Sequence, residues 1–180
     1  MPSIFTHPIV GLAAAKMLPA RYRTKRFWIL SFLCPFIPDL DGIGFYLGLP
    51  YEHLFGHRGI THSVFFALAL AIVIVAVFFR EREWLSKRNV LLVAYFTAIT
   101  VSHGLLDAIT NTSNGVAFFS PVITTRFLFG FSPIEASPLR ASEFFGERGF
   151  HVIMNELVWV WIPLIALVLV VSLIKRLMRR

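Results

Sequence analysis

Residues 64–79 read VFFALALAIVIVAVFF, sixteen consecutive residues without a polar side chain. A second stretch, residues 157–174, reads LVWVWIPLIALVLVVSLI and is interrupted only by Pro163 and Ser172. A helix needs about 20 residues to cross ~30 Å of hydrocarbon, so both stretches can span a membrane with help from flanking residues. These two stretches predict a polytopic, all-α membrane protein.

Three weaker segments extend this prediction to a bundle of about four to five membrane segments. Two of them are apolar but contain ionisable side chains, and the third is short for a full crossing and is typical of a half-helix or a tilted helix. The five segments are expected at about residues 4–20, 27–38, 62–79, 90–110 and 157–174, within a single domain over residues 1–180.

The composition excludes several other classes of protein. Hydrophobic residues make up 57% and charged residues 15% of the chain, whereas soluble domains carry roughly 25% charged residues. Cys34 is the only cysteine, which excludes a disulfide-stapled secreted fold, and we expect it to serve in packing.

The net charge of +7 is mostly a signal of membrane topology. Most of the basic residues fall in three short clusters. Five segments that run alternately up and down would place all three clusters on one face of the membrane. By the positive-inside rule that face is cytoplasmic. The chain is therefore expected in the inner membrane, with its N-terminus on the outer side and its C-terminus in the cytoplasm. A nucleic acid is therefore not expected as a partner. The clusters comprise Arg21, Arg23, Lys25, Arg26, Arg80, Arg82, Lys87, Arg88, Lys175, Arg176, Arg179 and Arg180.

Ionisable residues inside membrane segments are costly and indicate a functional site. His7, Asp39, His62 and His103 lie 13 to 18 residues from the nearest basic cluster, or roughly 20–27 Å at the rise of a helix. Four segments therefore bring polar groups to a similar depth near the outer interface, although each histidine taken alone is more typical of a hydrogen-bonded core residue.

The local spacings suit metal ligation. His103 and Asp107 are four residues apart and share one helical face, while Asp39 and Asp41 follow a proline that ends a helix. Nitrogen and oxygen ligands without thiolate suit zinc first, and also manganese or iron, and the number of ligands allows one or two ions. The candidate ligands are His7, Asp39, Asp41, His57, His62, His103 and Asp107.

Three further residues beside these ligands are candidates for catalysis. Arg58 can hold a phosphate oxygen in a bidentate manner, with anchoring to lipid headgroups as its alternative role. Thr61 and Ser63 can supply hydroxyl groups, with capping of the following helix as the alternative. A divalent metal lowers the pKa of bound water toward ~7, which favours attack on phosphorus or on a carbonyl carbon.

At these residues the sequence resembles the bacterial inner-membrane metal-dependent hydrolases of the YdjM-like type. The family pattern stands here as His7 to Gly11, Pro38 to Asp41, the heptapeptide HRGITHS at residues 57–63, and His103 to Thr110. The match covers roughly the first 120 residues. The resemblance implies a membrane-bound hydrolase with a divalent metal, distantly similar to zinc-dependent phospholipases C.

The segment from Asn111 to Glu156 is expected on the outer face as an aromatic loop or lid. It contains many phenylalanines and is broken by prolines, which indicates either contact with lipid headgroups or a cover over the helix bundle. Glu143, His151 and Glu156 can each add a ligand or a base from this side. The phenylalanines are Phe118, Phe119, Phe127, Phe129, Phe131, Phe144, Phe145 and Phe150.

These features favour an enzyme: a metal-dependent hydrolase that cleaves a phosphoester of a lipid or lipid-linked substrate at the outer membrane interface. One alternative is a divalent metal-ion transporter, although the two most apolar segments offer no polar path inward. Another alternative is a non-catalytic membrane protein with a structural metal. Membrane lipids are the expected surroundings.

Overall fold

The computed structural model describes residues 1–79, 81, 83–138 and 141–178, and every regular element in these ranges is helical. The N-terminal half contains α1 (Thr6–Met17), η1 (Ala20–Tyr22), α2 (Lys25–Leu33), η2 (Cys34–Gly42), α3 (Ile43–Tyr46), η3 (Ile60–His62) and α4 (Val64–Phe78). The C-terminal half contains α5 (Lys87–Ala108), α6 (Ala141–Phe144), α7 (Glu147–Glu156), the π-helical η4 (Leu157–Trp161) and α8 (Ile162–Leu177). The predicted all-α membrane bundle is confirmed.

Hydroxyl side chains cap the first turns of α2, α4 and α5. The side chains of Thr24, Ser63 and Ser86 accept hydrogen bonds from the backbone N–H three residues later, at 3.2, 3.1 and 3.2 Å. Each of these bonds satisfies one of the donors that the first turn of a helix leaves unpaired. The boundaries of α2, α4 and α5 therefore follow from local sequence.

Three helical runs are long and apolar enough to cross a membrane, namely Lys25–Tyr46, Lys87–Ala108 and Glu147–Leu177. The first is longer than the expected segment 27–38, because η2 and α3 continue α2 without a break. The apolar α4 is shorter, and α1, with 12 residues, is about 18 Å long. The crossing of the membrane by all five segments stays a prediction.

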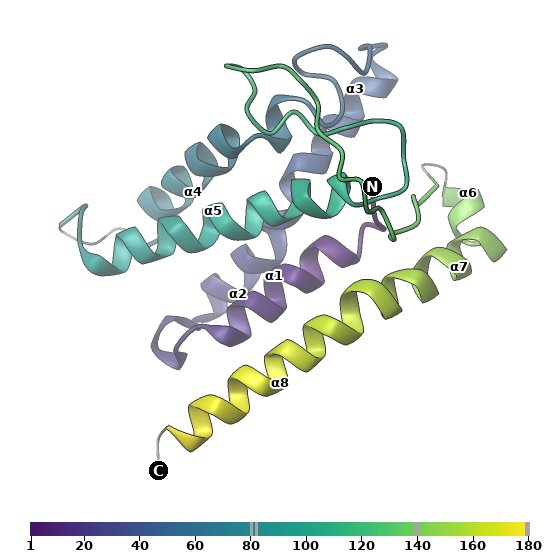
Figure 1. Cartoon of the computed structure of the whole chain (residues 1–180). Coiled ribbons are helices and arrows are strands. Elements are labelled where there is room, and N and C mark those ends of the chain that lie inside the picture. The colour runs from purple at the N-terminus through teal and green to yellow at the C-terminus, as the bar shows by residue number, and fades with distance from the viewer. Residues whose placement is uncertain (80, 82, 139–140, 179–180) are drawn as a thin grey trace.

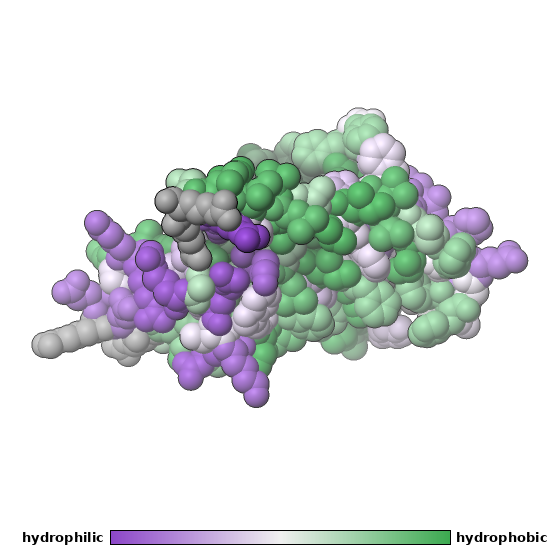
Figure 2. All heavy atoms as spheres, turned by 90° about the horizontal axis from the view of Figure 1, so that it is seen from below, coloured by the Kyte–Doolittle hydropathy of each residue, from purple (hydrophilic) through white to green (hydrophobic). Residues whose placement is uncertain are grey.

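The ends of the helices divide into two sides of the molecule. The α1–α2 turn, the α4–α5 connection and the end of α8 lie on one side, while the long loops and the N-terminus lie on the other (Figure 1). Polar residues gather at both ends, with an apolar middle between them (Figure 2). This arrangement agrees with the three basic clusters sharing one face. Four of their residues, Arg80, Arg82, Arg179 and Arg180, lie outside the described residues.

The core lies between α1, α2, α4 and α5. Phe27, Cys34, Ala71 and Phe96 are among its fully buried members, so Cys34 packs as expected. The helices α1 and α2 approach closely at Gly11, where an added Cβ would lie 2.0 Å from the carbonyl oxygen of Ser31. This core fills the bundle on the side away from the loops. The predicted metal ligands, described below, lie at the loop side.

The phenylalanines of the outer loop fall into two groups: some are buried against the helix bundle and others are exposed. Phe118 is buried against Ala108 and Val116 and so covers the end of α5. Other phenylalanines are exposed, with Phe131 at 66% and Phe145 at 85%. Their contact with lipid headgroups stays a prediction.

Candidate metal centre

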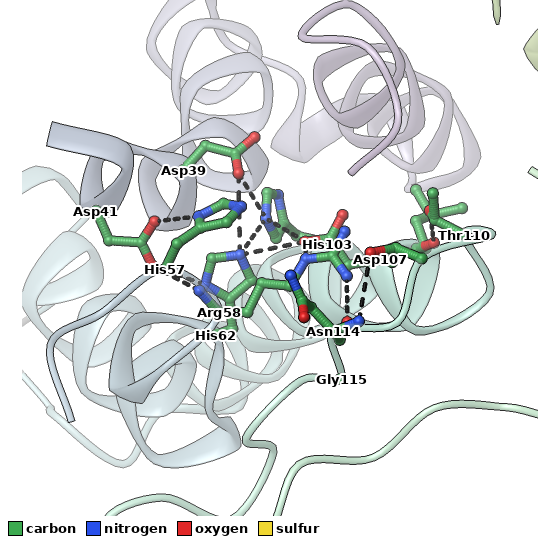
Figure 3. A network of polar contacts seen from close by, with 12 residues as sticks. Asp39, Asp41, His57, Arg58, His62, His103, Asp107, Thr110, Asn114 and Gly115 are labelled. Carbon is green, nitrogen blue, oxygen red and sulfur yellow. Dashed lines mark hydrogen bonds and ion pairs between the residues drawn. The ribbon is translucent and has the colours of Figure 1, made fainter. Parts of the chain in front are cut away.

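All seven predicted ligands converge at the loop side of the bundle. Figure 3 labels all of them except His7. Four elements and one loop supply them, from parts of the chain up to 100 residues apart. α1 supplies His7, η2 supplies Asp39 and Asp41, η3 and the residues before it supply His62 and His57, and α5 supplies His103 and Asp107.

The central group consists of Asp39, His62, His103 and Asp107, whose ligand atoms all lie within 4.8 Å of one another. The Nε2 atoms of His62 and His103 are 2.9 Å apart. His103 Nε2 lies 3.4 Å from Asp39 Oδ1, and His62 Nε2 lies 3.4 Å from Asp107 Oδ2. Two ligands on one tetrahedral zinc ion, each at about 2.1 Å, are separated by roughly 3.4 Å. The group therefore has the dimensions needed for one divalent ion.

The outer hydrogen bonds of both histidines prepare Nε2 for ligation. His103 Nδ1 lies 2.7 Å from the carbonyl oxygen of Pro35, which can only accept, so Nδ1 carries the proton. His62 Nδ1 lies 3.1 Å from Asp41 Oδ2, which favours the same tautomer. Both Nε2 atoms then direct lone pairs at each other and at two carboxylates. A cation between them converts this repulsion into attraction, as in carboxylate–histidine–metal arrangements.

His7 lies against this group without a hydrogen bond of its own. Its ring stacks on that of His103 with centroids 3.8 Å apart, and its Nε2 lies 3.9 Å from Asp107 Oδ1. Among the described residues, both ring nitrogens of His7 and all carboxylate oxygens of Asp39 and Asp107 are buried without a hydrogen-bond partner, although Asp107 Oδ2 forms an ion pair with Arg58. Buried polar atoms in folded proteins are almost always satisfied, so this concentration of unsatisfied ligand atoms fits a bound cation.

Asp41 differs from Asp39 because hydrogen-bond donors surround it. Its Oδ1 lies 2.7 Å from His57 Nδ1, and its Oδ2 accepts from Thr61 Oγ1 at 2.5 Å and from the backbone N–H of Arg58 at 3.2 Å. Asp41, His57 and His62 form a second possible ligand group. In this geometry Asp41 chiefly orients the two histidines, and the expectation that both aspartates turn toward one centre holds directly only for Asp39.

The two candidate hydroxyls have structural partners. Thr61 donates to Asp41, and Ser63 caps α4 by accepting from the N–H of Phe66. Both contacts agree with the capping and positioning role that was the alternative to catalysis. A part for either hydroxyl in a reaction stays a prediction.

Arg58 is buried rather than placed at the lipid surface, with 2% of its surface exposed. Its Nε lies 3.0 Å from Asp107 Oδ2, and its Nη1 donates to the carbonyl oxygen of Asn114 at 2.6 Å. Its φ of 62° is in the left-handed region that non-glycine residues rarely adopt. The alternative in which Arg58 anchors a helix to lipid headgroups is therefore wrong, because the side chain turns inward to a buried carboxylate.

Arg126 was not among the sequence candidates, and it ties the outer loop to the site. Its Nη1 donates to the carbonyl oxygen of His57 at 3.0 Å, and its Nη2 donates to that of Tyr51 at 2.5 Å. The guanidinium lies over the Tyr51 ring, 4.3 Å from its centroid. Burial raises the pKa of Tyr51 to about 12, so the neutral phenol donates to the carbonyl oxygen of Gly115 at 3.3 Å. No local motif marks Arg126, because its partners are backbone atoms of distant residues.

The three candidates from the C-terminal part lie apart from the two ligand groups. Glu156 is fully buried and accepts hydrogen bonds from the backbone and hydroxyl of Ser3 and from Thr6 Oγ1, the latter at 2.6 Å. It therefore fastens the N-terminal segment to α7. His151 is exposed on α7, and Glu143 lies on α6. Neither ligand group found among the described residues includes any of the three.

Comparisons with known proteins point to one family. The sequence profile of the YdjM inner membrane protein family matches residues 1–178. The chain belongs to this family. It is also similar to the inner membrane protein YbcI of Escherichia coli (strain K12), with 32% identity over 163 residues that cover 91% of this chain and 92% of the relative. No solved structure matches the chain significantly.

Membership of the YdjM family confirms the resemblance drawn from the His and Asp motifs, and it supports a location in the inner membrane. The profile extends beyond the first 120 residues that carry the motifs, so it includes the outer loop and α8. The descriptions of the family and of YbcI name a membrane and no reaction.

Proposed function

We propose that this protein is a metal-dependent hydrolase that cleaves a phosphoester of a lipid or lipid-linked substrate at the outer face of the inner membrane. The observation that carries this proposal is the buried cluster of histidines and aspartates, in which His7, Asp39 and Asp107 have buried ligand atoms without a hydrogen-bond partner. The carboxylates of Asp39, Asp41 and Asp107 outnumber the one guanidinium of Arg58 in this buried space. A divalent ion, with zinc as the first candidate and manganese or iron as others, would balance the excess negative charge.

His62, His103, Asp39 and Asp107 would hold the first ion, with His7 in reach as a further ligand. When bound, such an ion supplies Lewis acidity and an activated water molecule. Hydrolysis forms a P–O bond to the water oxygen and breaks the P–O bond to the alcohol, which leaves with one proton of the water. A second ion would need Asp41 and His57, whose mutual hydrogen bond would then be lost.

Arg58 would contribute by its charge. Its guanidinium is buried beside Asp107, where water does not screen it. Negative charge grows on the non-bridging oxygens of a phosphoester during attack, and a fixed donor in a water-poor site stabilises that charge strongly. A phosphate-bearing substrate therefore suits the chemistry of this site, and distant similarity to zinc-dependent phospholipases C is part of the proposal.

The apolar core beneath the site supports a hydrolase over a transporter. The cluster that includes Phe27, Val75, Leu92 and Phe96 is buried between α1, α2, α4 and α5. An ion that crossed the membrane would need polar groups along this path, because charged species in hydrocarbon are costly. The ligands instead gather at one end of the bundle.

The test combines metal analysis with a hydrolysis screen on the full-length protein in detergent. We expect bound zinc, manganese or iron in wild type, and release of phosphate or of a phosphorylated headgroup from at least one phospholipid or lipid-linked phosphoester. His103→Ala should lose both metal and activity, whereas His53→Ala, which removes an exposed histidine, should keep both. Bound metal without hydrolysis of any phosphoester would favour the structural-metal alternative. Metal uptake into sealed vesicles would favour the transporter.

A further inference from the structure

A cavity of about 530 Å³ opens directly beside the candidate metal centre. Asp39 and His57 line it on one side, and both are almost fully buried otherwise. Cavities between about 300 and 1,000 Å³ are the usual size for binding a small molecule. The cavity therefore gives a molecule of that size access to the ligand groups.

The rest of the cavity wall is apolar except at Met1, the N-terminal residue, and it faces outward. Ile4, Phe36, Phe45 and Tyr46 line it, with Ile4 at 50% and Tyr46 at 91% exposed. Phe45 also lies against the His57 ring, with centroids 5.3 Å apart, so the apolar wall runs up to the polar group without a gap. The occupant must be amphipathic, because one side of the space is ionic and the other is hydrocarbon and aromatic.

The position of the cavity identifies the source of such an occupant. Phe36, Phe45 and Tyr46 belong to Lys25–Tyr46, one of the three runs apolar and long enough to cross a membrane. Tyr46 is the last residue of that run, where aromatic side chains commonly meet the lipid headgroups. The mouth of the cavity therefore lies at the level expected for the lipid headgroups.

We propose that this cavity receives one hydrocarbon chain of the substrate, entering from the membrane beside α3, with its polar group directed at Asp39 and His57. This inference rests on the proposed function and narrows the substrate to a membrane amphiphile whose phosphoester lies next to a chain. A soluble phosphoester would leave the apolar wall uncovered.

Gly42 offers a way to fill the cavity without moving the backbone. It lies on the cavity wall in a helical conformation with φ −55° and ψ −21°, and an added Cβ would meet no atom within 4 Å. Gly130, in the outer loop, also has open space around its Cβ position but does not line the cavity. Gly42→Trp and Gly130→Trp are therefore matched in size and differ only in place. Gly42→Ala adds too little volume to close the space.

The test uses full-length protein reconstituted in phosphatidylcholine vesicles that contain a small fraction of a phosphatidic acid with a diazirine in its acyl chain. Photolysis should label peptides from residues 36–46 in wild type, Gly130→Trp and Gly42→Ala. Gly42→Trp should reduce that labelling about tenfold, equivalent to about 1.4 kcal/mol of binding. Equal labelling of this segment in Gly42→Trp and Gly130→Trp would show mere contact with bulk lipid and overturn the proposal.

Labelling does not require a reaction, so it separates this proposal from the proposed function. If Gly42→Trp abolishes labelling while wild type hydrolyses no phosphoester, the cavity binds a chain and the hydrolase proposal fails. If wild type hydrolyses a phospholipid and Gly42→Trp does so at the same rate, the chain does not enter here and only the cavity proposal fails. Metal content measured on each variant shows that the ligand groups are still assembled.

Discussion

His62 Nδ1 lies 3.1 Å from Asp41 Oδ2, on the side of the ring opposite to the one that faces the central ligand group. Asp41 is thus placed to hold the His62 proton on Nδ1 and to leave Nε2 as the metal-binding atom. The same carboxylate contacts Thr61 and His57, so one side chain fixes the orientation of several others. This relationship separates residues that would bind a metal from those that would orient its ligands, and the predictions below depend on that separation.

Asp41→Asn should weaken metal binding without abolishing it. Loss of a carboxylate partner of a ligating histidine typically lowers metal affinity about 10- to 100-fold. Zinc titration against a chromophoric chelator measures this change, and Glu52→Gln, an exposed carboxylate in the same outer region, is the matched control. An affinity equal to that of wild type would contradict the positioning role of Asp41.

Removal of metal should destabilise the protein, because ligand binding stabilises the folded state by mass action. At a free metal concentration of 100 times Kd the effect is about 2.7 kcal/mol. A chelator should therefore lower the Tm of wild type in detergent, and Asp39→Ala, His62→Ala and His103→Ala should each lose bound metal and most of that response. His151→Ala, an exposed histidine on α7, should respond as wild type does. Unchanged stoichiometry in all three variants would place the ligands elsewhere.

Arg58→Ala should reduce kcat by ~10²–10³, the usual cost of removing one fixed donor to a developing oxyanion. Arg58→Lys keeps the charge but loses the planar fork that contacts Asp107 and Asn114, so it should stay substantially impaired. Guanidinium is not a ligand, so both variants should still bind metal, with an affinity lowered by at most about 10- to 100-fold through the changed contact with Asp107. Arg148→Ala, an exposed arginine, controls for general loss of positive charge. Turnover by Arg58→Ala at the wild-type rate would remove Arg58 from the reaction.

Glu156→Gln should destabilise the fold while leaving metal binding intact. The carboxylate accepts three hydrogen bonds from Ser3 and Thr6, and an unsatisfied buried group costs about 1–3 kcal/mol. Thermal unfolding of the detergent-solubilised variant should show the loss, compared with Glu147→Gln at the exposed start of α7. Loss of metal from folded Glu156→Gln protein would instead make Glu156 part of the metal centre.

The orientation in the membrane is testable with reporters. An enzyme fused after the last residue should be active in the cytoplasm, because the last basic cluster closes the chain. An insertion at Gly130, which is exposed and has open space around it, should report from the outer side. Reporters on the same side would rule out the five-segment topology.

The sequence predicted which residues would gather as candidate ligands, because their signals are local or depend on depth alone. The spacing of His103 and Asp107 places both on one face of α5, and the distances from the basic clusters placed His7 and Asp39 at similar depths. The structure brings all of these residues together. It also agrees with the capping of α4 by Ser63, because a cap depends only on the next three residues.

The roles within the cluster depend on contacts that no spacing encodes. Asp39 and Asp41 are indistinguishable in the Pro-Asp-x-Asp motif, yet one has unsatisfied oxygens and the other has several donors around it. Arg58 turns inward because it forms an ion pair with Asp107 and donates a hydrogen bond to the carbonyl oxygen of Asn114. These contacts exclude the alternative in which its side chain faces the lipid. Arg126 binds backbone carbonyl oxygens, which every residue has. No sequence pattern therefore predicts that it links the outer loop to the site.

The sequence by itself determined that this is a helical membrane protein and which residues are suited to bind a metal, since hydrophobic runs, helical periodicity and ligand chemistry are properties of nearby residues. Only the tertiary structure decided which candidate ligand atoms face one another, which carboxylate is placed to orient the histidines, and where a cavity opens beside Gly42. The physical reason is that hydrogen-bond satisfaction and cavity shape arise between segments distant in the chain, after the helices have packed around the core.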